Sequence, residues 1–225
     1  MSYLNFNLKN LNLPLLGVAL IFDLFLLANG QAIFGPAFEA YQTPLGVYLA
    51  LITGSMVISN SVPEIQIGIE QALLVFIPVF VIMVVIFSQL FRVPPNNAPL
   101  GTVILTIIFY VMLVGLSEEI VFRGAIFQLF GGNITAVFIQ AVLFALFHIS
   151  AYTTVYGTLS VSSVLQAFAF GLIMGFIVYY AKTINRMQYG IAVTWAIHSA
   201  YDLSLSIGIF VVAFASLPFG LHFLV

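Results

Sequence analysis

The widest gap between charged residues is the feature that most constrains this chain. No Asp, Glu, Lys or Arg occurs between Arg123 and Lys182, a stretch of 58 residues (124–181). Soluble domains carry a charged residue at about every fourth position, whereas a transmembrane helix needs about 20 mostly apolar residues. The stretch is therefore long enough for two membrane-crossing helices and the loop between them, and it indicates a membrane protein.

The composition of the whole chain supports this interpretation. Only 12 of the 225 residues are charged, five Lys or Arg and seven Asp or Glu, and 63% are hydrophobic. Five basic residues are too few for the basic face of a nucleic-acid binder, so the expected partner is the lipid bilayer and no nucleic acid. The chain has no cysteine, which excludes disulfides, thiolate metal sites and a cysteine nucleophile.

Clusters of Gly, Pro and polar residues mark the ends of the apolar segments. They predict an all-α fold, a polytopic membrane helical bundle with about eight transmembrane helices, seven if two segments merge. The expected spans are residues 14–34, 45–61, 71–91, 100–117, 134–150, 160–181, 190–205 and 207–225. The fourth helix is expected to continue to about residue 130. With such short loops there is room for a single integral membrane domain and no second soluble one.

Several ionisable side chains fall inside these apolar segments. They are Asp23, Glu118, Glu119, Arg123, His148, His198 and Asp202. A charged side chain at the bilayer centre costs at least about 2.5–3.5 kcal/mol on insertion scales. Such residues usually face a bundle interior or a wet cavity, and they are functional candidates. Near the chain's end, His222 is expected at the membrane interface, and Trp195 is either an interface anchor or a pocket wall.

The first polar cluster contains two adjacent carboxylates and a guanidinium. Glu119 and Arg123 are four residues apart, so on an α-helix they share a face and can form an ion pair. Glu118 is turned by about 100° from Glu119, which leaves its carboxylate for another partner. The structural alternative is a salt bridge at the membrane edge with no role in chemistry.

The other two clusters place an imidazole one helical turn from a second side chain. Phe144 and His148 share a face, so the aromatic ring is expected to pack beside the imidazole. His198 and Asp202 project the same way, about 6 Å apart along the axis. The structural alternatives are a hydrogen-bonding His148 and a His–Asp pair that holds two helices together.

The motifs of other intramembrane enzymes are missing. The sequence has no Gly-x-Ser-x-Gly-like serine motif, no His-Glu-x-x-His zinc helix and no Gly-x-Gly-Asp aspartyl motif. The remaining chemistry is attack by a water molecule that a carboxylate activates, with or without a metal. A tetrahedral intermediate would also need hydrogen-bond donors for its oxyanion.

The three clusters resemble the motifs of the CPBP intramembrane proteases, the CAAX prenyl protease and bacteriocin-processing family also called Abi. That family's pattern is Glu-Glu-x-x-x-Arg, then Phe-x-x-x-His, then His-x-x-x-Asn or Asp. Here the three motifs are Glu118 to Arg123, Phe144 to His148 and His198 to Asp202, in the same order. The resemblance covers about residues 100–205. It divides the membrane domain into residues 1–99, with no recognised motif, and a family-like catalytic core at 100–225.

The resemblance implies a glutamate-dependent endopeptidase whose site lies within the membrane. Its catalytic residues would be Glu118 as base, His148 to position the water, and His198 with Asp202 at the oxyanion. Supporting roles fall to Glu119, Arg123 and Phe144. The family is also described as metalloproteases, and the Asp at position 202 makes a zinc site of Glu118, His148, His198 and Asp202 chemically reasonable. A metal-free oxyanion site is the favoured expectation.

The expected function is hydrolysis of a peptide bond in a membrane-associated protein or peptide. The role would be CAAX-protease-like processing, bacteriocin maturation or self-immunity. The small size and short loops favour a multi-pass protein of a prokaryotic cell membrane. Two other functions fit buried ionisable groups: a non-enzymatic immunity or scaffold protein of the same fold, and a proton-coupled transporter. The concentration of polar residues in the C-terminal half argues against a transporter.

Overall fold

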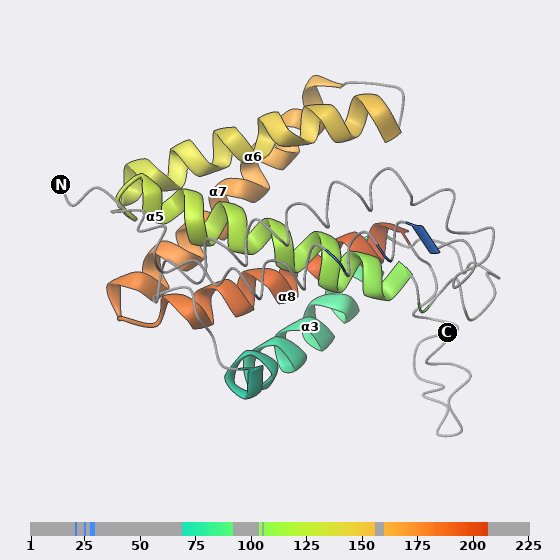
Figure 1. The fold of residues 1–225 in the computed structure, drawn as a ribbon, viewed down its shortest axis with the longest axis horizontal. Coiled ribbons are helices and arrows are strands. Elements are labelled where there is room, and N and C mark those ends of the chain that lie inside the picture. The colour runs from blue at the N-terminus through green and yellow to red at the C-terminus, as the bar shows by residue number, and fades with distance from the viewer. Residues whose placement is uncertain are drawn as a thin grey trace.

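The structure is a computed structural model that describes part of the chain. It describes Ile21, Phe25, Ala28, Asn29, residues 69–91, Ile104, residues 106–155 and residues 160–206. Within these residues the regular elements are all helices, and no strand occurs (Figure 1). The predicted all-α class is therefore confirmed. The predictions for Asp23, His222 and the spans at 14–34, 45–61 and 207–225 lie outside the described residues.

The helices begin and end close to the predicted span boundaries. Their order is α3 (Ile69–Phe91), η3 (Phe109–Leu116), η4 (Glu119–Ile126), α5 (Phe127–Leu129), α6 (Ile134–Val155), α7 (Val161–Thr183) and α8 (Met187–Ser206). The chain is helical without a break from residue 106 to residue 129, as expected for the fourth helix. Within it, η3 and η4 are π-helical, with wider turns than an α-helix.

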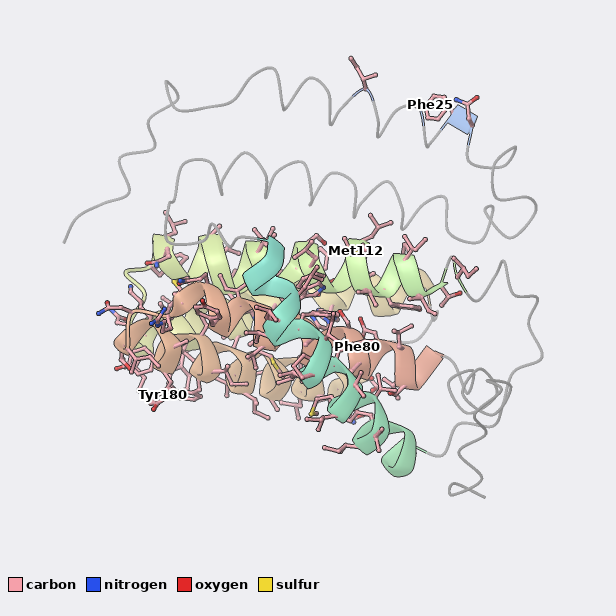
Figure 2. The ribbon with its side chains drawn as sticks, turned by 90° about the horizontal axis from the view of Figure 1, so that it is seen from below. Phe25, Phe80, Met112 and Tyr180 are labelled. Atoms are coloured by element: carbon pink, nitrogen blue, oxygen red, sulfur yellow. The ribbon has the colours of Figure 1, made fainter. Side chains whose placement is uncertain are left out.

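The described helices pack around α8. The helices α3 and α7 and the segment η3 all lie against α8, while α6 packs on α7 (Figure 1). The segment η4 contacts α6, α7 and α8, so it lies where three helices meet. Figure 2 shows α3 crossing the other helices at a steep angle, with Phe80 at the crossing. Because the polar motifs are on η4, α6 and α8, this packing brings them together.

Local sequence explains the tight reversals between these helices. Gly131 and Gly132 have φ values of 90° and 59°, a region that glycine enters without strain. Asn133 then caps α6, because its Oδ1 accepts a hydrogen bond from the Ala136 N–H at 3.1 Å. Ser160 caps α7 in the same way, accepting from the Ser163 N–H at 3.1 Å.

Small residues allow α6 and α7 to approach closely. A Cβ added to Gly171 would lie 3.0 Å from the Ala141 Cα, and one added to Gly175 would lie 3.0 Å from Val137 Cγ1. The buried Gln140 side chain donates to the Gly171 carbonyl at 2.7 Å. Close backbone contact through small residues and a polar link between helices are both typical of membrane helix pairs.

The outer surface of the described bundle is apolar, and its interior contains the polar groups. Large exposed side chains include Leu74 and Ile82 on α3 and Ile173 on α7, whereas Glu118 and Arg123 are buried. Met112 and Tyr180, also exposed, lie at opposite edges of the bundle in Figure 2. Contiguous apolar surface of this kind marks an interaction with membrane or protein.

One described helix is long and apolar enough to cross a membrane by itself. This helix is α7, Val161–Thr183; the apolar parts of α3 and α6, Leu73–Phe87 and Ile134–Ile149, are shorter. The total number of spans, seven or eight, and the division into residues 1–99 and 100–225 stay predictions.

Candidate active site

The two adjacent glutamates lie where two wide helical segments meet. Glu118 is between η3 and η4, and Glu119 is the first residue of η4. The prediction assumed α-helical turns at this point and was wrong in that respect. π-helical segments are rare and are frequent at functional sites. In η3 the Val111 carbonyl accepts a hydrogen bond from Trp195 Nε1 of α8 at 2.6 Å, so a contact outside the helix supports its geometry.

Glu119 and Arg123 form the predicted ion pair. Arg123 Nη1 lies 3.3 Å from Glu119 Oε1, and both side chains are fully buried. The same Oε1 accepts a hydrogen bond from His198 Nδ1 on α8 at 2.8 Å. Since a carboxylate without a proton can only accept, this bond places a hydrogen on Nδ1 and turns Nε2 of His198 away from Glu119.

Glu118 faces both imidazoles of the predicted site. Its Oε2 lies 3.8 Å from His148 Nε2 and 3.9 Å from His198 Nε2. His148 Nδ1 donates to the Phe144 carbonyl at 2.9 Å, because a carbonyl oxygen can only accept. Both rings therefore have their Nδ1 fixed by a second group, and both present Nε2 to the same carboxylate.

Asp202 completes the cluster from one turn further along α8. Its Oδ2 lies 3.5 Å from His198 Nε2. The Asp202 and His148 side chains are 18% and 19% exposed, while Glu118 is fully buried and His198 is 3% exposed. His148 and Asp202 are thus the more exposed members of the cluster, and Glu118 is the most deeply buried.

Aromatic rings surround the cluster on three helices. Phe144 packs beside His148 as predicted, with ring centroids 4.3 Å apart. Phe170 of α7 lies 5.2 Å from the His198 ring and 5.2 Å from the Tyr201 ring. Phe170 and Tyr201 were not predicted as site residues, because nothing in the sequence distinguishes them among the 23 Phe and 10 Tyr of the chain.

Trp195 has an interior position. It is 7% exposed, its ring packs tilted against that of Phe76 of α3 with centroids 4.1 Å apart, and its Nε1 donates to the Val111 carbonyl. It therefore joins α8 to α3 and η3, which contradicts an interface anchor. None of these contacts is with the Glu118 cluster.

The four proposed zinc ligands converge, and Nε2 of each imidazole faces the Glu118 carboxylate. Nδ1 of His148 and of His198 is hydrogen-bonded, as the second ring nitrogen of metal-binding histidines usually is. Among the described residues, no group of three or more His, Asp or Glu is arranged to hold a metal ion as the side chains stand. Metal dependence stays a prediction.

Comparison with known protein families gives a match to part of the chain. Residues 100–204 match the family model described as type II CAAX prenyl endopeptidase Rce1-like. Neither the comparison with curated proteins nor that with solved structures gives a match. The matched range contains all three motifs and ends next to the predicted limit of 205. It supports a CAAX-protease-like intramembrane peptidase in general. Residues 100–204 of this chain are therefore similar to the CAAX prenyl endopeptidase family, as the order of the three motifs predicted.

Proposed function

We propose that this chain is an intramembrane endopeptidase in which Glu118 activates a water molecule. The observation that carries the proposal is the position of the Glu118 carboxylate, buried and within 3.9 Å of Nε2 of both His148 and His198. Three helices supply these groups, so the site forms only when those helices pack together.

The distance between Glu118 and His148 suits a shared water molecule. Glu118 Oε2 and His148 Nε2 are 3.8 Å apart, and one water can lie at about 2.6–3.2 Å from each of them. Because His148 Nδ1 donates to the Phe144 carbonyl, a neutral His148 accepts at Nε2. The water then donates one hydrogen to each group, and its oxygen lone pair is free to attack a carbonyl carbon.

The proton balance of the reaction needs only residues of this cluster. Glu118 takes a proton from the water as the new C–O bond forms, and the carbonyl oxygen becomes an oxyanion. When the tetrahedral intermediate collapses, the C–N bond breaks and Glu118 returns that proton to the leaving nitrogen. The products are a carboxylic acid and an amine, which become a carboxylate and an ammonium group when the acid's proton passes to the amine, and the net reaction consumes one water.

His198 and Asp202 are placed to bind the oxyanion. His198 donates from Nε2 only when the ring carries both protons. The carboxylates of Glu118, Glu119 and Asp202 lie 2.8–3.9 Å from that ring and would stabilise its positive charge. Asp202 then holds the ring in place, or donates itself when protonated. Donors held in advance at an oxyanion contribute on the order of 10²–10³ in rate.

The substrate class follows from the family and from the position of the site. The family description names a CAAX prenyl endopeptidase, so a prenylated protein C-terminus is the first substrate to test. A membrane-associated bacteriocin precursor is the second. The multi-pass topology and the prokaryotic membrane are part of the same proposal.

The test is cleavage by the full chain in proteoliposomes. Internally quenched peptides with a farnesylated cysteine before the last three residues, and the same peptides without farnesyl, serve as probes. We expect cleavage by the wild type and none by Glu118→Gln, with equal protein yield and equal thermal unfolding. Full turnover by Glu118→Gln would move the base to Glu119. Proton flux across the vesicles without any cleavage would instead favour a transporter.

A further inference from the structure

Arg123 is a buried cation with few polar partners. Its side chain is fully buried, and none of its Nε, Nη1 and Nη2 atoms makes a hydrogen bond with a residue that the structure describes. Its ion-pair partner is the Glu119 carboxylate at 3.3 Å. A guanidinium in an apolar interior needs further compensation for its lost hydration.

The ring of Phe144 provides that compensation. The guanidinium carbon of Arg123 lies 4.0 Å from the centroid of the Phe144 ring, within the range of a cation–π interaction. The ring is itself buried, at 1% exposure, so water does not weaken the attraction. Phe122 supports the ring from the side, edge-on at 5.2 Å.

Phe144 also contacts the other half of the site. Its ring packs at 4.3 Å from the His148 ring, and its carbonyl accepts the hydrogen of His148 Nδ1. Arg123 in turn fixes Glu119, which accepts from His198 Nδ1. One aromatic residue is therefore linked to both imidazoles. Its ring contacts His148 and, edge-on at 5.9 Å, His198, and it is also linked to His198 through Arg123 and Glu119.

We propose that Phe144 is a positioning residue that acts through a cation–π interaction with Arg123. The electron-rich face of its ring holds the guanidinium where it fixes Glu119, and Glu119 sets the hydrogen position and orientation of His198. The role in turnover rests on the proposed function, whereas the role in orienting His198 does not depend on any substrate.

The first arm of the test changes the electron density of the ring and keeps its shape. Mono-, di- and trifluorinated phenylalanine are incorporated at position 144 of the full chain, because each fluorine weakens the cation–π attraction. Using the farnesylated peptide, we expect kcat to fall stepwise, by a total on the order of tenfold, with KM unchanged. Cyclohexylalanine, which has the size of Phe but no π face, should lower kcat at least as much.

Phe122 gives the matched control. It is also buried and packs on Phe144, and no cation lies over its ring among the described residues. Fluorination there should leave kcat unchanged. A flat kcat across the series at position 144, or an equal fall at position 122, would overturn the proposal in favour of simple packing.

The second arm needs no substrate and separates failure of this inference from failure of the proposed function. The Nδ1–H proton of His198 is observed by NMR in ¹⁵N-histidine-labelled protein and is assigned by its loss in His198→Gln. The chain has three histidines, so the assignment is simple. We expect the signal to broaden or be lost with trifluorophenylalanine at 144, which keeps an aromatic ring against His198 but weakens the attraction to Arg123, and to stay with the same residue at 122. An unchanged signal in both variants contradicts the positioning role, even if the wild type cleaves the peptide. A signal that responds only at 144 supports it, even if no peptide is cleaved.

Discussion

At the scale of single residues, the two adjacent glutamates have different surroundings and should respond differently to mutation. Glu119 is bonded to both Arg123 and His198, whereas Glu118 faces the two Nε2 atoms. Arg123→Ala leaves Glu119 as a buried charge without its cation, which should lower the free energy of unfolding by about 3–5 kcal/mol. Glu118→Gln keeps the shape and should remove activity only.

Thermal unfolding in detergent, measured beside peptide cleavage, checks this difference. Phe122→Leu, a packing change next to the same ion pair, serves as the control for general loss of stability. Equal loss of stability in Glu118→Gln and Arg123→Ala would contradict the separate roles.

Asp202 distinguishes a metal-free reaction from a metal-dependent one. If Asp202 only supports an oxyanion site, Asp202→Asn should retain activity, because an amide donates a hydrogen bond without needing a proton. We expect this outcome, together with full activity after exhaustive chelation. Loss of activity with chelator that zinc restores, and an inactive Asn variant, would show that Asp202 binds a metal.

At the scale of elements, the site depends on a close approach between η3 and α8. A Cβ added to Gly115 would lie 2.5 Å from the Oγ of Ser199, the residue that follows His198 on α8. Gly115→Ala should therefore move α8 away from η3, disturb His198, and lower both activity and stability, the latter by about 1–3 kcal/mol.

The double variant Gly115→Ala with Ser199→Ala tests the cause. Removal of the Ser199 hydroxyl takes away the nearest obstacle, so part of the activity and of the melting temperature should return. A double variant no better than Gly115→Ala would show that the Tyr110 carbonyl, 3.0 Å from the added Cβ, limits the approach instead.

The elements were predictable to different degrees. The lengths of the apolar runs, and the Gly or Asn residues that separate them, predicted α6, α7 and α8. Both features can be read from residues that are neighbours in the sequence. The pairs Glu119–Arg123 and Phe144–His148 followed from four-residue spacing, and the structure confirms both contacts. The π-helical turns were missed, since their support includes Trp195 binding Val111, 84 positions away. The bond between His198 and Glu119 spans 79 positions, and no local pattern in a single sequence indicates such a contact.

At the scale of the whole molecule, the apolar exterior predicts how the bundle responds to charge. Ile173 is 58% exposed in the middle of α7, and Ile184 is 53% exposed just after its end. In a bilayer, Ile173→Asp should cost about 2.5–3.5 kcal/mol of insertion free energy, while Ile184→Asp should cost little. The measurement is the fraction of each variant that stays in the membrane after alkaline carbonate extraction. Equal retention of both variants would contradict a membrane position for the middle of α7.

The wide turns of η3 and η4 limit how the length of this helix can change during evolution. A π turn closes over one residue more than an α turn, so deleting a residue between 112 and 116 would let the helix tighten. The deletion would also rotate the part of the helix after the deleted residue relative to the part before it. Val111 is bound to Trp195 ahead of that point, and Glu119 is bound to His198 beyond it. Both partners are on α8, so the distance between them along that helix is fixed. Homologues should therefore tolerate insertions and deletions at the 131–133 turn and show none between residues 111 and 119.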